Sequence, residues 1–399
     1  MHPLASLRLK NKADRRLRGG HVWVYSNEVD VAATPLKQFQ AGEQVRVESA
    51  QGKCLGIAMV SPNNLICARL VSRDESQMLD GRLLRDRLHA ALQLRESFCT
   101  EPFYRLVYGD SDQLPGLVVD RFGDYLVVQL ATAGMERLAD EIIAALVDVL
   151  SPKGILFKND ARIRGAENLP AAVEIVYGEV PEQLELIENG VRFRAPVFSG
   201  QKTGWFYDHR CNRARLRDYV AEKTVLDVFS YIGGWGVQAA AFGAQHVTCV
   251  DSSEAALEGV RNNAALNGVA DKVECLAGAA FEVMKQLIDA QRRFDVVIID
   301  PPAFIPRRKD IRQGEQAYHR ANALALRLVA PGGFLVSASC SMHLSRTSLV
   351  DVLRVESRHV DRSVRIVEQG GQGFDHPVHP AIAETDYLKA VFALVSLNR

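Results

Sequence analysis

The feature that most constrains the fold is an alternation of strand-like and helix-like stretches that begins near residue 190. Short apolar runs alternate there with segments whose apolar residues recur at helical spacing. The strand-like runs are TVLDVF, VTCVD, KVECLAG, FDVVIIDPP, FLVSASC, SVRIVEQ and YLKAVFALVSL. This pattern predicts a mostly parallel, doubly wound α/β sheet of seven strands over residues 190–399. The last two runs have no helix between them, which predicts one antiparallel edge strand.

The first 189 residues have a different pattern and predict two further domains. Residues 1–72 contain short alternating stretches separated by Gly, Pro and Asn, which predict a β-rich domain, a small barrel. Residues 73–189 combine helical patterns over 76–99 and 134–150 with strand-like runs, including a hairpin centred on RFGD. This mixture predicts an α+β domain. A chain of 399 residues is long enough for each domain to bury its own core.

The composition is that of an ordinary globular protein, with 47% hydrophobic residues, 24% charged residues and a formal net charge of zero. No apolar run approaches the roughly 20 residues that span a bilayer, so we expect no membrane contact. The N-terminus lacks the hydrophobic region of a signal peptide, which predicts a cytoplasmic protein. The seven cysteines are scattered and form no C-x-x-C pair. This spacing argues against a disulfide framework and against zinc, and we expect no metal.

Positive charge is concentrated locally although the net charge is zero. The members of the three basic clusters are Arg8, Lys10, Lys12, Arg15, Arg16 and Arg18, then Arg210, Arg213, Arg215 and Arg217, and finally Arg307, Arg308, Lys309 and Arg312. Such clusters on a neutral chain form phosphate-binding patches for nucleic acid. Solvated helix faces and turns explain any single cluster equally well.

Reactive side chains gather at the predicted carboxyl ends of the parallel strands. In open α/β sheets, ligands bind outside these ends. Asp227, Asp251 and Asp300 end three of the strand-like runs, and Cys340 ends a fourth. Buried carboxylates are costly without partners, so packing alone does not explain their accumulation along one edge. We therefore expect the active site at this edge.

The loop after Asp227 resembles a nucleotide-binding loop. Gly234-x-Gly236-x-x-Ala239 matches the dinucleotide fingerprint, which leaves a nicotinamide enzyme as one alternative. In that fold, however, the first glycine follows the strand directly, whereas the segment 230–233 intervenes here. A longer glycine loop suits a ligand without phosphates, such as S-adenosylmethionine. Asp251 is then placed to accept hydrogen bonds from both ribose hydroxyls.

The segment DPPAF, residues 300–304, is the more specific signal. Two prolines after a strand-ending Asp stop the sheet and stiffen the loop. The Asp300 carboxylate and a nearby backbone carbonyl can accept hydrogen bonds from the amino group of a base, and Phe304 offers a stacking surface. An ordinary strand-ending turn is the structural alternative.

The sequence APGG, residues 330–333, predicts a turn before the apolar run FLV, and Cys340 lies in the following SASCSMH, where a buried strand reaches solvent. Core filler, metal ligand, disulfide partner and nucleophile are the alternatives for such a cysteine. Other cysteines are explained by packing, because they lie in strand-like stretches: Cys54, Cys67, Cys249 and Cys275. Strand packing of this kind does not account for Cys340. His343 follows it closely and is left without an assigned role.

Taken together, these motifs resemble one family over essentially the whole chain. GGHVWVYSNEV, SGQKTGWFYDHR, DVFSYIGGWG, VDSSEAAL, NNAALNG, DPPAF and SCS occur in the order typical of the bacterial 23S rRNA 5-methylcytosine methyltransferases of the large-subunit methyltransferase I type. The resemblance implies a PUA-like RNA-binding domain at 1–72, a central α+β domain at 73–189 and a Rossmann-like class I methyltransferase domain at 190–399. It implies S-adenosylmethionine as cofactor and 23S rRNA as partner. The oligomeric state, including a homodimer, is left open.

The resemblance also implies roles for individual residues. The cofactor is expected to contact Asp227, Phe229, Ser230, Gly233, Gly234, Asp251, Ser252, Ala279 and Asp300. The base is expected to contact Pro301, Pro302 and Phe304. One departure is Ala279, since related enzymes usually place an Asp there to hold the adenine amino group; a backbone group or another side chain must replace it.

Cys340 and Asp300 are the expected catalytic residues. In this class of sheet the fifth strand lies beside the fourth, which places Cys340 next to Asp300. A thiolate that adds to carbon 6 of cytosine makes carbon 5 nucleophilic enough to accept a methyl group. Asp300 is expected to bind the cytosine edge and to assist protonation at ring nitrogen 3. A base then removes the proton from carbon 5, and the thiolate leaves.

Three other functions remain open at this point. An amino-group or guanine N7 methyltransferase can use DPPAF without a covalent intermediate. A nicotinamide-dependent oxidoreductase would bind the dinucleotide, and a non-catalytic RNA-binding protein would bind RNA without methyl transfer. The target nucleotide and the assembly stage of the ribosomal RNA are not indicated by the sequence.

Overall fold

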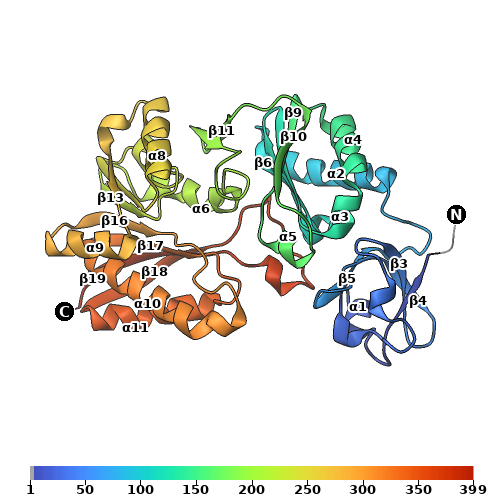
Figure 1. Ribbon diagram of the computed structural model, residues 1–399. Helices are drawn as coiled ribbons and strands as arrows, with labels where there is room; N and C mark the ends of the chain where they lie inside the picture. Colours follow the sequence, from blue (N-terminus) through green and yellow to red (C-terminus); the bar gives the residue numbers. More distant parts are fainter. Residues whose placement is uncertain (1–3, 399) are drawn as a thin grey trace. The chain divides into compact units, whose positions relative to one another are not determined.

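The computed structural model describes residues 4–398 (Figure 1). Contacts between residues divide the chain into two compact units that do not follow chain order. The first unit comprises residues 1–184, 195–207 and 374–385, and the second comprises 185–194, 208–373 and 386–399. The predicted domain boundaries at 72/73 and 189/190 stay predictions. Within residues 4–398, no helix is both long enough and apolar enough to cross a membrane.

The N-terminal strands form a five-stranded sheet with the order β1-β3-β4-β5-β2. Its strands are β1 (Ser6–Arg8), β2 (Trp23–Tyr25), β3 (Gln44–Glu48), β4 (Cys54–Val60) and β5 (Ile66–Ser72), with the short helix α1 (Arg15–Arg18) between the first two. A single bridge from Leu9 to Val29 joins the two edges. The predicted small barrel is therefore present in a partly closed form, around a core that includes Leu7, Val47 and Ala68.

The following segment forms a second five-stranded sheet with the order β10-β9-β8-β7-β6. Its strands are β6 (Phe103–Tyr108), β7 (Leu117–Phe122), β8 (Tyr125–Leu130), β9 (Gly154–Asn159) and β10 (Ala172–Gly178), and its helices are α2 (Gly81–Glu96), α3 (Ala133–Arg137), α4 (Ala139–Leu150) and α5 (Ile163–Ala166). The β7–β8 hairpin confirms the predicted turn at RFGD. The predicted helix over 134–150 is wrong in one respect, because it is interrupted at Leu138. A two-stranded sheet, β11 (Gln183–Glu188) and β12 (Val191–Pro196), follows.

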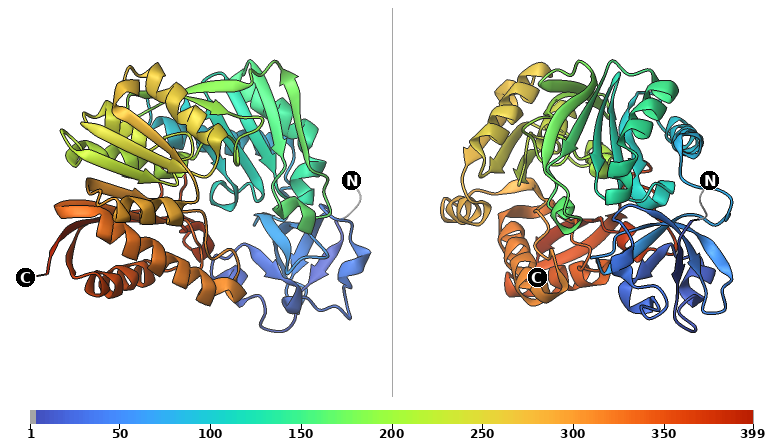
Figure 2. Two further views of the ribbon diagram at one scale, coloured as in Figure 1. Left: turned by 60° about the vertical axis from the view of Figure 1, so that its left-hand side comes forward. Right: turned by 45° about the vertical axis from the view of Figure 1, so that its right-hand side comes forward.

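The second unit contains the predicted seven-stranded sheet, with the order β15-β14-β13-β16-β17-β19-β18. Its strands are β13 (Thr224–Val228), β14 (His246–Asp251), β15 (Val273–Ala277), β16 (Phe294–Ile299), β17 (Val329–Ser339), β18 (Arg362–Gly370) and β19 (Lys389–Leu397). Its helices are α6 (Arg210–Ala214), α7 (Gly236–Ala241), α8 (Glu254–Leu266), α9 (Ala280–Asp289), α10 (Ile311–Leu328) and α11 (Arg346–His359). The helices α9, α10 and α11 cover one face with a large apolar core, and α7 and α8 pack against strands β13 to β15 (Figures 1 and 2). The doubly wound fold class is confirmed.

Two details of this sheet correct the prediction. The antiparallel strand is β19, which lies between β17 and β18 and not at the edge. Strand β18 forms the edge instead. The residues APGG, which read as a turn, lie inside β17 as an irregularity: Val329 pairs with Phe294, and the next pair is Phe334 with Val296. The inserted residues are accommodated because Gly332 has a φ of +87°, a conformation that glycine adopts without strain.

Candidate active site

The predicted reactive residues lie at one edge of the seven-stranded sheet. Strands β14, β13, β16 and β17 are adjacent and parallel, so their carboxyl ends share this edge. Asp251 ends β14, Asp227 is the second-to-last residue of β13, Asp300 directly follows β16, and Cys340 directly follows β17. The sequence therefore predicted correctly that these four residues lie at or next to the carboxyl ends of the parallel strands.

The loop from Phe229 to Trp235 is held in an unusual backbone conformation. Phe229 and Tyr231 have positive φ angles of 68° and 48°, and Gly233 has a φ of 87°. The amides of Phe229 and Ser230 both donate to the carbonyl of Val250, at 2.9 and 3.0 Å. Left-handed conformations of non-glycine residues occur mainly where the surrounding structure holds them, and they cluster at functional sites. The hydrogen bonds to Val250 on β14 therefore stabilise the conformation of this loop.

Asp251, the last residue of β14, also stabilises this loop. Its Oδ2 accepts a hydrogen bond from the amide of Tyr231, and its Oδ1 accepts one from the amide of Ser253, each at 2.9 Å. Each carboxylate oxygen has a second lone-pair direction left for a ligand. Asp251 is half-buried, whereas the neighbouring Ser252 is exposed. Asp251 thus combines a structural role in the loop with capacity to bind hydroxyl groups.

Asp227 is fully buried, and only part of its carboxyl group is used. Oδ2 accepts a hydrogen bond of 2.8 Å from the amide of Gly236, at the start of α7. Within the described part of the chain, Oδ1 has no hydrogen-bond partner, and the buried Oγ of Ser230 has none either. Burial raises the pKa of Asp227 to about 7, although the Gly236 amide opposes this; Asp300 and Asp251 add to the rise. Buried polar groups normally have partners, so these two atoms indicate a ligand site.

Asp300 has a contrasting environment. Its Oδ2 accepts a hydrogen bond of 2.9 Å from the indole Nε1 of Trp235, and its Oδ1 lies 3.3 Å from Nε2 of His209. Burial raises the pKa of Asp300, but the charge of His209 and the hydrogen bonds outweigh it and hold the pKa below its usual value. Asp300 is therefore an ionised acceptor. This favours binding of an amino group over the expected assistance to protonation at ring nitrogen 3.

His209 and Trp235 were not found by sequence reasoning. His209 ends the short 3₁₀ helix Tyr207–His209, directly before α6, and is distant in sequence from the strand that carries Asp300. Its ring centroid lies 5.2 Å from that of Trp235. Both residues occur in motifs that resembled the family, FYDHR and IGGWG, but nothing in those letters shows that they converge on one carboxylate.

Cys340 is held between two buried serines. The hydroxyl of Tyr318 on α10 lies 2.8 Å from the Oγ atoms of both Ser339 and Ser341. The thiol of Cys340 is half-buried and donates a long contact of 3.9 Å to the carbonyl of Pro301, the residue after Asp300. None of the seven cysteines forms a disulfide bond. The serines of SASCSMH therefore position a cysteine beside the DPPAF loop.

The DPPAF loop itself is tied to the same network. The amide of Ile305 donates to Ser341 Oγ at 3.2 Å. Pro301 is buried and Pro302 is exposed. Phe304 is half-buried in an aromatic cluster, with ring centroids 5.0 Å from Tyr318 and 6.1 Å from Phe281. Much of its ring is used in packing, and its role as a stacking surface for a base stays a prediction.

The remaining predicted residues are less defined. Gly233 packs so closely that an added Cβ would lie 2.6 Å from Val237 Cγ2, which explains a glycine there. Ala279 is exposed at the start of α9 and makes no side-chain cap. His343 is half-exposed and forms no hydrogen bond or ion pair among residues 4–398. The assignments of Gly234, Ser252 and Ala279 to the cofactor stay predictions.

The three basic clusters differ in their availability. In the second cluster Arg213 is buried and pairs with Glu188 at 2.6 Å, so this cluster is largely structural. In the first, Arg16 pairs with Glu28 at 2.9 Å. The third cluster follows DPPAF, and its members are all exposed: Arg307, Arg308, Lys309 and Arg312. The phosphate-binding patch stays a prediction, which the exposed third cluster favours most and the second favours least, because Arg213 is buried.

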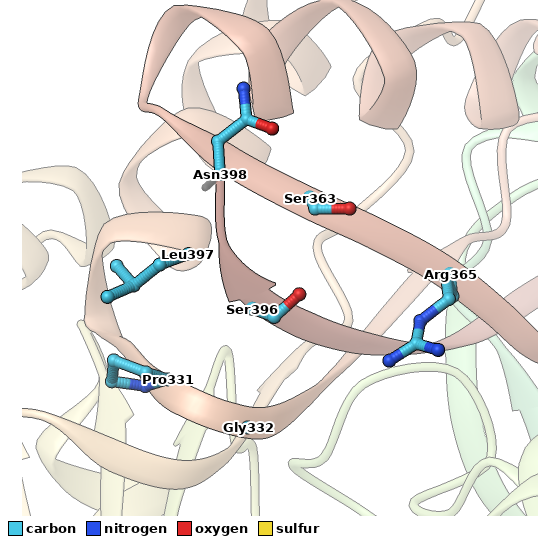
Figure 3. A pocket seen from close by; sticks show the side chains of 7 residues that line it. All are labelled: Pro331, Gly332, Ser363, Arg365, Ser396, Leu397 and Asn398. Atoms are coloured by element: carbon cyan, nitrogen blue, oxygen red, sulfur yellow. The ribbon is translucent and has the colours of Figure 1, made fainter.

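A hollow elsewhere on the second unit is separate from this site. It is lined by Pro331, Gly332, Ser363, Arg365, Ser396, Leu397 and Asn398 (Figure 3). These residues lie at the start of β17 and β18 and at the end of the antiparallel β19, hence at the opposite edge of the sheet from Cys340.

The fold and the site together define a class of protein, the S-adenosylmethionine (SAM)-dependent methyltransferases. A family model described as an S-adenosylmethionine-dependent methyltransferase matches residues 160–392, and one described as a PUA-like domain matches residues 7–73. SAM is therefore the cofactor, and the nicotinamide and non-catalytic alternatives are set aside.

The chain belongs to the ribosomal RNA large subunit methyltransferase I family. It is 34% identical over 381 residues to the ribosomal RNA large subunit methyltransferase I of Klebsiella pneumoniae (strain 342), covering 94% of each chain. It is 35% identical over 384 residues to the protein of that name from Vibrio cholerae serotype O1, covering 94% of this chain and 96% of the relative. A solved chain described as a methyltransferase complexed with SAH has the same fold, with a TM-score of 0.83 at 22% identity, over 98% of this chain and 100% of that one.

Proposed function

We propose that this methyltransferase forms 5-methylcytosine in 23S rRNA, with Cys340 as a covalent nucleophile. The relatives are named as methyltransferases of large subunit ribosomal RNA, which supports the substrate. The observation that carries the mechanism is the position of the Cys340 thiol, 3.9 Å from the carbonyl of the residue after Asp300. This contact supports the proposal, because Pro301 adjoins Asp300, the proposed acceptor for a base amino group.

The cofactor site is supported by the unpartnered atoms of the glycine loop. The buried Asp227 Oδ1 and Ser230 Oγ lack partners among the described residues, and the α-ammonium of SAM would supply donors for them. Asp251 would accept hydrogen bonds from the ribose hydroxyls. When bound, SAM supplies an electrophilic methyl group on a sulfonium. The fully ionised form of Asp227 would be favoured by a nearby cation, which would lower its raised pKa.

The protein's own residues account for the activation of the base. The thiolate of Cys340 donates an electron pair to carbon 6, which breaks the C5=C6 double bond while ring nitrogen 3 takes a proton from water. Asp300 accepts hydrogen bonds from the 4-amino group and orients the ring. After methylation at carbon 5, loss of the carbon 5 proton to a solvent base re-forms the double bond and breaks the S–C6 bond, and ring nitrogen 3 returns its proton to water. Cys340 leaves as thiolate, ready for another cycle.

The exposed third basic cluster supports an RNA substrate. Arg308, Lys309 and Arg312 form no ion pair within residues 4–398, and they lie a few residues after DPPAF in the chain. Phosphate contacts by such residues release counterions, so RNA binding is expected to weaken with added salt. PUA-like residues 7–73 are the other expected RNA-binding region.

Covalent trapping tests the proposal. Cys340→Ala and Cys340→Ser should abolish methyl transfer but keep SAM affinity, because a hydroxyl supplies almost no anion at neutral pH. RNA with 5-fluorocytidine at the target should become attached to the wild-type protein, since fluorine does not leave as a proton. Digestion should place the crosslink on the peptide SASCSMH.

A matched control is Cys275→Ala, a half-buried cysteine of β15 that should remain active. A fully active Cys340→Ala enzyme would remove the covalent mechanism. It would favour methylation of an exocyclic amine, for which the ionised Asp300 and its prolines suffice.

A further inference from the structure

Lys389 is a buried cation in an otherwise apolar strand. It begins β19, whose remaining residues, AVFALVSL, carry no charge, and it is 5% exposed. Its ammonium donates to two main-chain carbonyls, those of Ser341 and Tyr387, each at 2.7 Å. Among residues 4–398 no carboxylate forms an ion pair with it. A buried ammonium without an anionic partner is costly, because neutral carbonyls only partly replace its hydration.

The contacts of Lys389 lie on both sides of Cys340. In the antiparallel pairing of β17 with β19, Lys389 is the direct partner of Ser339, the residue before Cys340. The carbonyl that Lys389 binds belongs to Ser341, the residue after Cys340. The ammonium has three N–H groups, of which these contacts use two. Lys389 is therefore anchored to the two residues that flank Cys340 in the chain.

Two acidic groups, Cys340 and Asp386, influence the charge of Lys389. Burial lowers the pKa of Lys389 to about 8, while Cys340 and Asp386 oppose this and Arg346 adds to it. Asp386 is exposed, so solvent screens its charge. Tyr318 bridges the flanking serines, but burial raises its pKa to about 12, which keeps it neutral. Near neutral pH Lys389 is mostly protonated, and the Cys340 thiolate is the partly buried anion that its charge can stabilise.

We propose that Lys389 is a positioning residue whose ammonium is the counter-ion of the Cys340 thiolate and increases the thiolate fraction at neutral pH. A neighbouring cation lowers the pKa of a cysteine. The thiol proton passes to solvent, and Lys389 keeps its protons throughout. The consequence for catalysis rests on the proposed role of Cys340 as nucleophile, whereas the electrostatic pairing does not.

The pairing can be measured without RNA or SAM. Full-length protein is alkylated with iodoacetamide over a series of pH values, and the rate at Cys340 is followed by mass spectrometry of its peptide. The midpoint is the pH at which this rate reaches half of its maximum. In the wild-type protein it should lie below the ordinary thiol pKa of about 8.5. Lys389→Met should raise the midpoint by one pH unit or more, so that alkylation at pH 7 slows about tenfold. Lys389→Arg should keep a low midpoint, because it keeps the charge.

The control is Lys285→Met, which removes an exposed lysine of α9 and should leave the midpoint unchanged. An unchanged midpoint in a folded Lys389→Met protein would overturn the proposal. If that variant does not fold, the alkylation midpoint of the wild-type protein tests the proposal. A midpoint at or above pH 8.5 would exclude a thiolate stabilised by a cation. A low midpoint together with an active Cys340→Ala enzyme would leave the pairing intact and remove the covalent mechanism, so the two failures are distinguishable.

Discussion

Asp227 and Asp300 lie at the ends of neighbouring parallel strands, β13 and β16, yet their carboxyl groups are shifted in opposite directions. Burial raises the pKa of Asp227 to about 7, and one of its oxygens lacks a partner among the described residues. Burial acts on Asp300 too, but His209 and Trp235 hold its pKa below the usual value. Asp227 thus has a carboxyl group with an unused acceptor oxygen, whereas the charge of Asp300 is already stabilised by its neighbours.

This difference separates the two halves of the proposed site. A carboxylate that is kept ionised by fixed donors presents a constant acceptor, which suits recognition of a neutral base. A carboxyl group whose ionisation is unfavourable until a cation arrives suits the ammonium end of SAM. The two side chains are identical in chemistry, so their neighbours and not their residue type assign the roles.

The largest expected effect is that of Asp300→Asn. Loss of the charged acceptor should lower the single-turnover rate of methylation on the order of 10²-fold, by analogy with removal of one fixed group from a preorganised electrostatic site. SAM affinity, measured by calorimetry, should fall by less than the rate, although Asp300 is also an expected cofactor contact. A rate within about threefold of wild type would show that Asp300 does not orient the base.

Asp227→Asn should instead affect stability, with a defined dependence on pH. The folded-state pKa lies above the ordinary value, so wild type loses stability as the pH rises from about 4 to about 7. Asn lacks this ionisation, and its stability relative to wild type should increase over the same range by about 1–4 kcal/mol. Thermal unfolding at pH 5 and pH 8 measures the difference.

Asp271→Asn, an exposed substitution in the same unit, is the control for Asp227 and should show no such trend. A constant difference in melting temperature between pH 5 and pH 8 would contradict the contrast between the two carboxyl groups.

Asp251→Ala tests the third carboxylate of the edge. It should weaken SAM binding by roughly 1–3 kcal/mol, because the ribose hydroxyls lose a charged acceptor and the Tyr231 amide loses its partner. Asp251→Asn keeps one acceptor oxygen, so its SAM affinity should lie between those of the wild-type protein and Asp251→Ala. Calorimetric titration measures both, and an unchanged affinity in the Ala variant would place the cofactor elsewhere.

The smallest effect is expected from His209→Gln. This substitution should raise the pKa of Asp300, as burial does for Asp227. Without the imidazole beside Oδ1, burial is less opposed and the pKa of Asp300 rises. The acid limb of the pH profile of methylation should therefore move upward, with a loss of up to about tenfold at pH 6 and little loss at pH 8. A uniform loss across pH would indicate a purely structural role for His209.

Much of the architecture followed from the sequence because it depends on local patterns. Alternating strands and helices predict a parallel sheet, and parallel strands place their carboxyl ends at one edge. Asp227, Asp251, Asp300 and Cys340 were therefore predictable as a group. The position of β19 was not, because an apolar strand without a preceding helix pairs as well at an edge as between two strands.

Tertiary structure alone decided the environment of these residues. His209 and Trp235 converge on Asp300, and Tyr318 and Lys389 converge on the serines around Cys340, from segments far apart in the chain. Lys389 was visible only as one charge in an apolar run. Likewise, Arg213 and Arg308 belong to similar basic clusters, but one is buried against Glu188 and the other is exposed. The sequence determined which groups reach the edge of the sheet, whereas burial and neighbouring charges, which arise only on folding, decided which of them are ionised.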